Sequence, residues 1–129
     1  MKVPDLTSID DASVRTWSGS IEPLKSAAAH ANLKFAHPDL AHAKDRATLF
    51  AELDRALGLP DHFGHNWDAL ADVLEDRDWL GKMGRVIAFT GTGPYKREHP
   101  TDWSTLEDIL QEACEFWKEF HVAFWVFAA

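Results

Sequence analysis

Apolar residues recur every three or four positions in several segments of this chain, which is the spacing of one buried face of a helix. The segments are residues 22–31, 45–57, 66–75 and 104–120. Asp45 and Asn66 stand where a helix needs an N-cap, and Gly58 stands where a helix needs a C-terminal stop. Ser104, followed by Glu107, matches the pattern of a capping box. The pattern therefore predicts helices over these segments.

Between the helical segments lie short apolar runs that predict strands. They cover residues 33–36, 85–90 and 122–127. The last run, VAFWVF, contains no polar residue and is typical of a strand buried on both faces. Strands that alternate with helices favour an α/β fold, in which helices pack on a small parallel sheet. Residues 14–17 fit either a short edge strand or an ordered arm, and the segment 91–102, rich in glycine and proline, is predicted to be a loop.

The composition narrows the class of protein. With 129 residues, of which 46% are hydrophobic, the chain is long enough for one domain with a real core. Its net charge of −8 disfavours nucleic acid and anionic membranes as direct partners and favours a basic protein or a cation. The single cysteine, Cys114, excludes an internal disulfide and fits a reducing compartment. No apolar run resembles a signal peptide or a membrane span, so we expect a cytoplasmic location.

Acidic residues are concentrated between residues 59 and 78, where Arg77 is the only base. The acids are Asp61, Asp68, Asp72, Glu75, Asp76 and Asp78. On a helix that begins near residue 66, one side carries the apolar residues Trp67, Leu70, Val73 and Leu74, which are predicted to join the core. The other side carries Asp68, Asp72, Glu75 and Asp76 within an arc of about 100°. Like charges four residues apart repel each other and lower the stability of the helix. An acidic cluster that is kept despite this cost predicts a surface that binds a positively charged partner.

The motif P-x-x-F-G-x-N-W-D-A-L-x-D at residues 60–72 resembles the barstar family, whose members are intracellular inhibitors of the bacterial ribonuclease barnase. The similarity extends over roughly residues 33–127 and includes the preceding helix, the RVIAFT strand, the LQEA segment and the C-terminal strand. The resemblance implies a three-stranded parallel sheet packed with helices. It also implies a single domain over residues 1–129, in which residues 1–31 are an N-terminal extension.

The resemblance further implies that a helix and its preceding loop block the active site of a basic ribonuclease. Asp68 and Asp72 match two acids of the family's binding helix, and Asp72 matches the one that mimics a substrate phosphate. Gly64 matches a glycine that lets the backbone approach the enzyme, Asn66 matches the start of the helix, and Glu112 matches an acid at the rim of the interface. The predicted partner-binding residues are Asp61, His62, Phe63, Gly64, His65, Asn66, Asp68, Ala71, Asp72, Glu75 and Glu112.

Two departures from the family concern the partner. His62 stands where the best-known member has a tyrosine that stacks over the enzyme's catalytic histidine, and Ala71 stands where that member has a tryptophan. The predicted function is therefore that of a non-catalytic antitoxin or immunity protein, which binds one basic bacterial ribonuclease or ribonuclease-type toxin. We predict no catalytic residues, metal or cofactor.

Two other classes stay open at this level. His62, His65, Asp68 and Asp72 have residue types that bind zinc, although a loop followed by a helix does not readily bring all of them together. Paired carboxylates can also serve a small hydrolase if burial separates their pKa values. The chain contains no Ser/His/Asp arrangement and no phosphate-binding glycine loop that would support such an enzyme.

Overall fold

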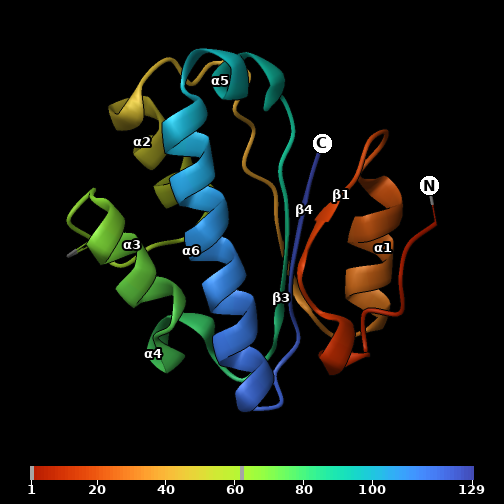
Figure 1. The fold of residues 1–129 in the computed structure, drawn as a ribbon. Coiled ribbons are helices and arrows are strands. Elements are labelled where there is room, and N and C mark those ends of the chain that lie inside the picture. The colour runs from red at the N-terminus through yellow and green to blue at the C-terminus, as the bar shows by residue number, and fades with distance from the viewer. Residues whose placement is uncertain (1, 62) are drawn as a thin grey trace.

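The computed structural model describes residues 2–61 and 63–129 and shows one parallel sheet with helices on both faces (Figure 1). The strands are β1 (Val14–Thr16), β2 (Lys34–Ala36), β3 (Arg85–Ala88) and β4 (Phe124–Ala128). Their order is β1-β4-β3-β2, and each neighbouring pair is parallel. The predicted α/β class is confirmed. Over the described residues the sheet has four strands rather than the predicted three, because β1 pairs with the free edge of β4.

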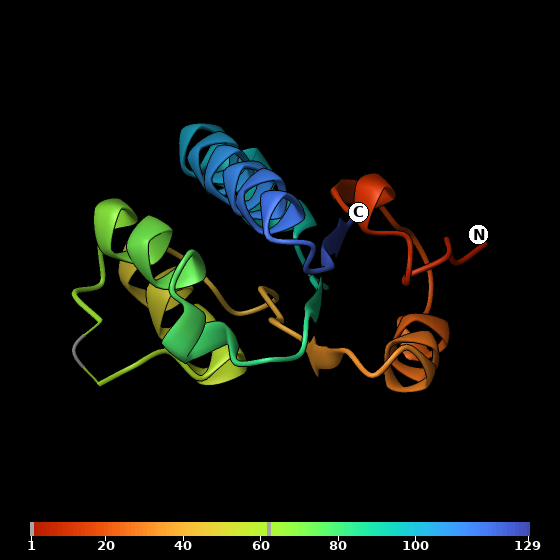
Figure 2. The ribbon, with the colours of Figure 1, turned by 90° about the horizontal axis from the view of Figure 1, so that it is seen from below.

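The helices are distributed unequally over the two faces of the sheet (Figure 2). They are η1 (Ile9–Asp11, a 3-10 turn), α1 (Glu22–His30), α2 (Arg46–Leu57), α3 (Trp67–Leu74), α4 (Arg77–Leu80), α5 (Gly93–Glu98) and α6 (Pro100–Glu119). Helices α2, α3, α4 and α6 lie on one side of the strands, and α1 lies on the other together with the N-terminal segment. The side with α2, α3 and α6 contains the larger core.

Successive residues of the central strands enter different cores. Phe124 and Val126 of β4 pack in the larger core, whereas Trp125 and Phe127 pack in the smaller core with α1. This alternation explains why the C-terminal strand has no polar position, and it confirms the prediction of a strand buried on both faces. The indole Nε1 of Trp125 donates to the carbonyl of Leu6 at 3.0 Å, so the N-terminal segment also satisfies a polar atom of the sheet.

The predicted ends of α2 are confirmed. The carboxylate of Asp45 accepts from the amide of Thr48 at 2.9 Å and completes a capping box. Gly58 adopts a left-handed conformation with φ of 61°, which a glycine enters without steric cost and which reverses the chain after Leu57. Helix α2 is therefore capped at both ends, and the loop that follows it begins at Gly58.

The prediction of a loop over 91–102 is wrong, because this segment contains α5 and the first turn of α6. Pro94 and Pro100 lie in the first turns of these helices, where a missing amide proton costs nothing. Ser104 consequently lies inside α6, and the predicted capping box at residues 104–107 is also wrong. No helix among the described residues is long and apolar enough to cross a membrane.

Candidate functional site

Helix α3 presents one apolar face to the core and one acidic face to solvent. Leu70 and Leu74 are fully buried, and Val73 is nearly so. The side-chain oxygen of Asn66 accepts from the amide of Ala69 at 2.8 Å, which confirms the predicted N-cap. At the other end, the carbonyl of Leu74 accepts from the indole of Trp117 in α6 at 2.7 Å. The helix is thus fixed at both ends.

The acids of α3 meet an acid from α6. Asp68 and Asp72 are exposed on α3, and Glu75 is partly buried at its C-terminus. Burial raises the pKa of Glu75, and the negative charges of Glu112 and Asp72 raise it further. This coupling places Glu112 of α6 in the same electrostatic environment as Glu75 and Asp72. The structure therefore brings together acids from two helices on one surface, here called the acidic surface (Asp68, Asp72, Glu75 and Glu112).

The acidic surface forms no ion pair with the part of the chain that the structure describes. Among the described residues, none of the ion pairs involves Asp68, Asp72, Glu75 or Glu112. Unpaired carboxylates at this density favour a positively charged partner, because each repels its neighbours in the free protein.

Two sequence predictions about this helix need correction. Asp76 was predicted to lie on the same helix as Asp68 and Asp72, but α3 ends at Leu74. Asp76 instead caps α4 by accepting from the amide of Asp78 at 2.8 Å. Trp67 was predicted to lie in the core, but it is only partly buried. Its ring packs edge-on against that of Phe50, with 4.9 Å between the ring centres. The apolar spacing alone did not indicate that α3 ends at Leu74 and that a second short helix, α4, follows it.

The loop between α2 and α3, described at residues 58–61 and 63–66 and here called the α2–α3 loop, precedes the acidic surface. Asp61 and Gly64 are exposed, whereas Phe63 is buried and packs edge-on against Phe50 at 5.9 Å. Phe63 therefore anchors the loop instead of presenting its ring to a partner. A Cβ atom at position 64 would lie 3.1 Å from the side-chain nitrogen of Asn66, so the glycine also makes room for the helix cap.

The remaining predicted residues have different surroundings. Ala71 is partly buried, and His62 lies outside the described residues. His65 is half exposed, and its Nε2 lies 3.5 Å from a carboxylate oxygen of Asp54 in α2. Among the described residues, no group of three or more His, Cys, Asp and Glu side chains is arranged to hold a metal ion.

Arg46 is a residue of this region that the sequence analysis missed. Its guanidinium donates to Asp102 of α6 at 3.0 Å and lies 5.6 Å from the ring centre of Trp67, so it connects α2 with α6 and α3. Burial of Asp102 acts to raise its pKa, but hydrogen bonds from Arg46 and Tyr95 lower it overall. A sequence signal existed, because a base at a helix N-terminus opposes the helix dipole and indicates an acidic partner elsewhere.

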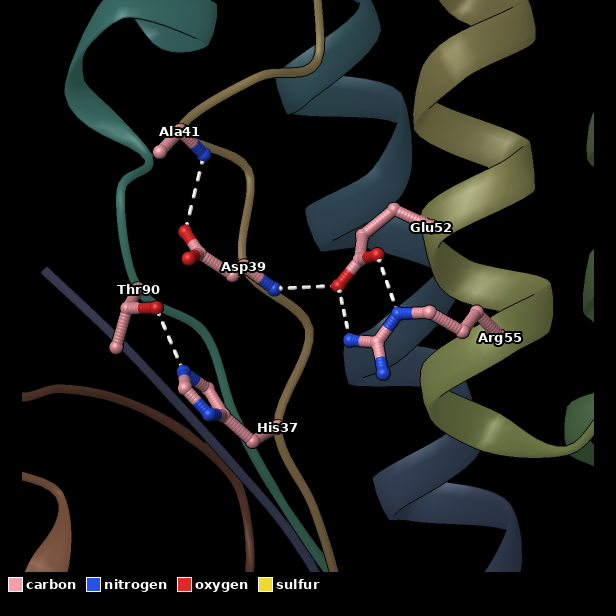
Figure 3. Close-up of polar contacts among 6 residues, drawn as sticks. All are labelled: His37, Asp39, Ala41, Glu52, Arg55 and Thr90. Carbon is pink, nitrogen blue, oxygen red and sulfur yellow. Dashed lines mark hydrogen bonds and ion pairs between the residues drawn. The ribbon is translucent and has the colours of Figure 1, made fainter.

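A second polar cluster lies at the carboxyl ends of β2 and β3 (Figure 3). The imidazole of His37 is 2.7 Å from the hydroxyl of Thr90, and Glu52 accepts from the amide of Asp39 at 2.8 Å. Glu52 also forms an ion pair with Arg55 at 2.6 Å. These groups satisfy one another and connect the segment after β2 to β3 and α2, so we assign them a structural role.

Comparison with known protein families gives a match to the family described as barstar (barnase inhibitor), over residues 33–129. The matched region includes α2, the α2–α3 loop, α3 and α6, and thus every member of the acidic surface. No curated protein sequence matches the chain.

Proposed function

Since this chain belongs to the barstar family of barnase inhibitors, we propose that it is a non-catalytic protein that inhibits a basic bacterial ribonuclease or a ribonuclease-type toxin. In this proposal one inhibitor binds one enzyme through the acidic surface and the α2–α3 loop. The carboxylates occupy the positions in which the enzyme would bind RNA phosphates.

The convergence of unpaired acids from α3 and α6 carries this proposal. A ribonuclease must place Arg and Lys side chains against phosphate oxygens, which builds a positive field in its active site. A carboxylate accepts the same charge-assisted hydrogen bonds as a phosphate oxygen. Asp68 and Asp72 are exposed and form no ion pair with residues 2–61 or 63–129, so their oxygens are available for such bonds.

The raised pKa of Glu75 supports the same proposal. It means that ionising Glu75 costs more free energy in the free protein than ionising an ordinary glutamate, because the carboxylate is partly buried and lies near Glu112 and Asp72. A cationic partner would relieve this penalty on binding. The net charge of −8 would also accelerate encounter with a basic enzyme.

The inhibitor would act in the cytoplasm, where it protects the cell from the enzyme. Residues 1–31 would form part of the same domain, since β1 extends the sheet and Leu24 and Ala28 of α1 are buried in the smaller core.

Titration calorimetry against barnase and a panel of basic bacterial ribonucleases tests the proposal. We expect one enzyme of the panel to bind at one to one and to lose its activity on RNA. The same purified chain, assayed alone in the presence of a chelator, should leave RNA intact. Failure to bind any enzyme of the panel, together with hydrolysis of RNA by the chain alone, would overturn the proposal.

A further inference from the structure

We propose that His65 is a positioning residue, which joins the α2–α3 loop to α2 through Asp54 and so holds the loop ready for ribonuclease binding. This inference rests on the proposed function. It assigns a role to the side chain of Asp54, which lies outside the predicted partner-binding residues.

The backbone of His65 is the first observation. His65 has φ of 51°, in the left-handed region that a residue with a side chain seldom adopts. The conformation occurs where the chain passes from the buried Phe63 to Asn66, the cap of α3. Such a conformation persists when surrounding contacts determine it.

The side chain of His65 makes contacts that can supply this determination. Its ring centre lies 5.0 Å from that of Phe63 and 6.4 Å from that of Phe50. Its Nε2 lies 3.5 Å from Oδ2 of Asp54, close enough for an ion pair when the imidazole is protonated. The imidazole thus lies between the rings of Phe63 and Phe50 on one side and the carboxylate of Asp54 on the other.

Asp54 contacts both ends of the loop. Its backbone carbonyl accepts from the amide of Gly58 at 3.0 Å and from that of Leu59 at 3.4 Å, where the loop begins. Its carboxylate faces His65, where the loop ends. Asp54 is itself well placed to hold the loop, because the neighbouring residues Leu53 and Leu57 are buried in the larger core. Both ends of the loop therefore contact the same residue of α2, Asp54.

A loop held in this way loses less conformational freedom when it binds, which improves affinity without any new contact to the partner. The ion pair is partly exposed, with side-chain accessibilities of 49% for His65 and 40% for Asp54. Exposed pairs of this kind contribute little, so we expect each single variant to weaken binding by about two- to five-fold.

Long-range electrostatics predicts the opposite sign for one variant. His65→Asn removes a group that carries positive charge when protonated, next to an acidic surface, so charge alone would make binding to a basic enzyme tighter. Loss of the contact between loop and helix makes binding weaker. Asparagine also tolerates the left-handed backbone, so this substitution tests the side chain without adding backbone strain.

The experiment compares His65→Asn, Asp54→Asn and the double variant with His121→Asn. His121 is a matched control, because it is an exposed histidine with φ of 59° in the turn after α6. The first measurement is hydrogen exchange of the Phe63 amide in the free protein, since this amide donates to the carbonyl of Pro60 at 2.9 Å within the loop. The second is the dissociation rate of the complex with barnase.

We expect both single variants to accelerate Phe63 exchange and dissociation from barnase, the double variant to add little to either single one, and His121→Asn to change neither. Unchanged exchange in both single variants would overturn the proposal, as would tighter binding of His65→Asn. Faster exchange in both single variants with an unchanged dissociation rate would refute the role in inhibition, while the contact between loop and helix would stand. If the wild type does not bind barnase, the dissociation rate is measured with the enzyme of the ribonuclease panel that it does bind. Failure to bind any enzyme of the panel is the separate failure of the proposed function.

Discussion

Replacement of Asp72 by alanine should separate the binding surface from the fold. Asp72 is exposed on α3 and forms no ion pair among the described residues. It lies four residues from Asp68 in the same helix, and this like-charge pair costs about 0.2–0.5 kcal/mol. Alanine also has the higher helix propensity. The free energy of unfolding should therefore stay the same or rise slightly.

The effect of Asp72→Ala on binding should be much larger. In the proposed complex the carboxylate neutralises Arg or Lys side chains of the enzyme, and its removal leaves those cations buried without a counter-charge. The expected penalty is about 2–5 kcal/mol, a range informed by charge pairs of the barnase–barstar interface itself. This corresponds to a loss of affinity of about 30-fold to several thousand-fold.

Two measurements on the same protein samples test this reasoning. Thermal unfolding followed by circular dichroism reports stability, and inhibition of a ribonuclease that binds the wild type reports affinity. Glu22→Ala is the matched charge control, because Glu22 lies at the start of α1 on the other face of the sheet and is exposed. It should leave inhibition nearly unchanged. Leu70→Ala is the control for folding, since Leu70 is fully buried and its truncation should cost about 2–5 kcal/mol.

The assignment of α3 as the binding helix would be refuted by either of two results. One is that Asp72→Ala unfolds the protein or lowers its melting temperature as much as Leu70→Ala does. The other is that Asp72→Ala inhibits the enzyme as well as the wild type does, while Glu22→Ala is weaker.

Three further outcomes are expected. The association rate with a basic ribonuclease, measured by stopped flow, should fall steeply as the Debye length shrinks from about 30 Å at 0.01 M salt to about 10 Å at 0.1 M; a constant rate would exclude steering by the acidic surface. Because the pKa of Glu75 is raised in the folded state, the ionised carboxylate opposes folding, and this penalty grows as pH rises from the ordinary pKa through the raised one. Glu75→Gln should therefore melt higher than the wild type at about pH 7, and the difference should disappear below about pH 4; a lower melting temperature at neutral pH would contradict the sign. Deletion of residues 1–32 should expose Trp125 and Phe127 and abolish the near-ultraviolet dichroism of a packed core, and a truncated protein that melts like the full chain would show that the smaller core is dispensable.

The sequence by itself determined the features that depend on residues within a few positions of one another. Asp45, Gly58 and Asn66 define helix ends through contacts with their own neighbours, and all of them act as predicted. The outward direction of Asp68 and Asp72 follows from helix geometry and the apolar residues opposite them. Glu112 entered the candidate site only through the resemblance to a family, because nothing local links it to α3.

Tertiary structure decided the features that depend on distant partners. β1 is three residues long, and its sequence left an edge strand and an ordered arm both open. It is a strand because β4 offers an unpaired edge. Pro100 is equally compatible with a loop and with the first turn of a helix, and its neighbours in sequence did not distinguish the two.

The same limit applies to the candidate site. Glu75 has a raised pKa because the fold partly buries its carboxylate and because α6 brings Glu112 near it. His65 contacts Asp54 because the α2–α3 loop folds back on α2. Local spacing determines which face of a helix a residue occupies, but only the packing of one helix on another determines what that face meets. The acidic face was therefore predictable from local spacing, and Glu112 from the resemblance to a family. The effect of Glu112 on Glu75 and the contact between His65 and Asp54 required the folded chain.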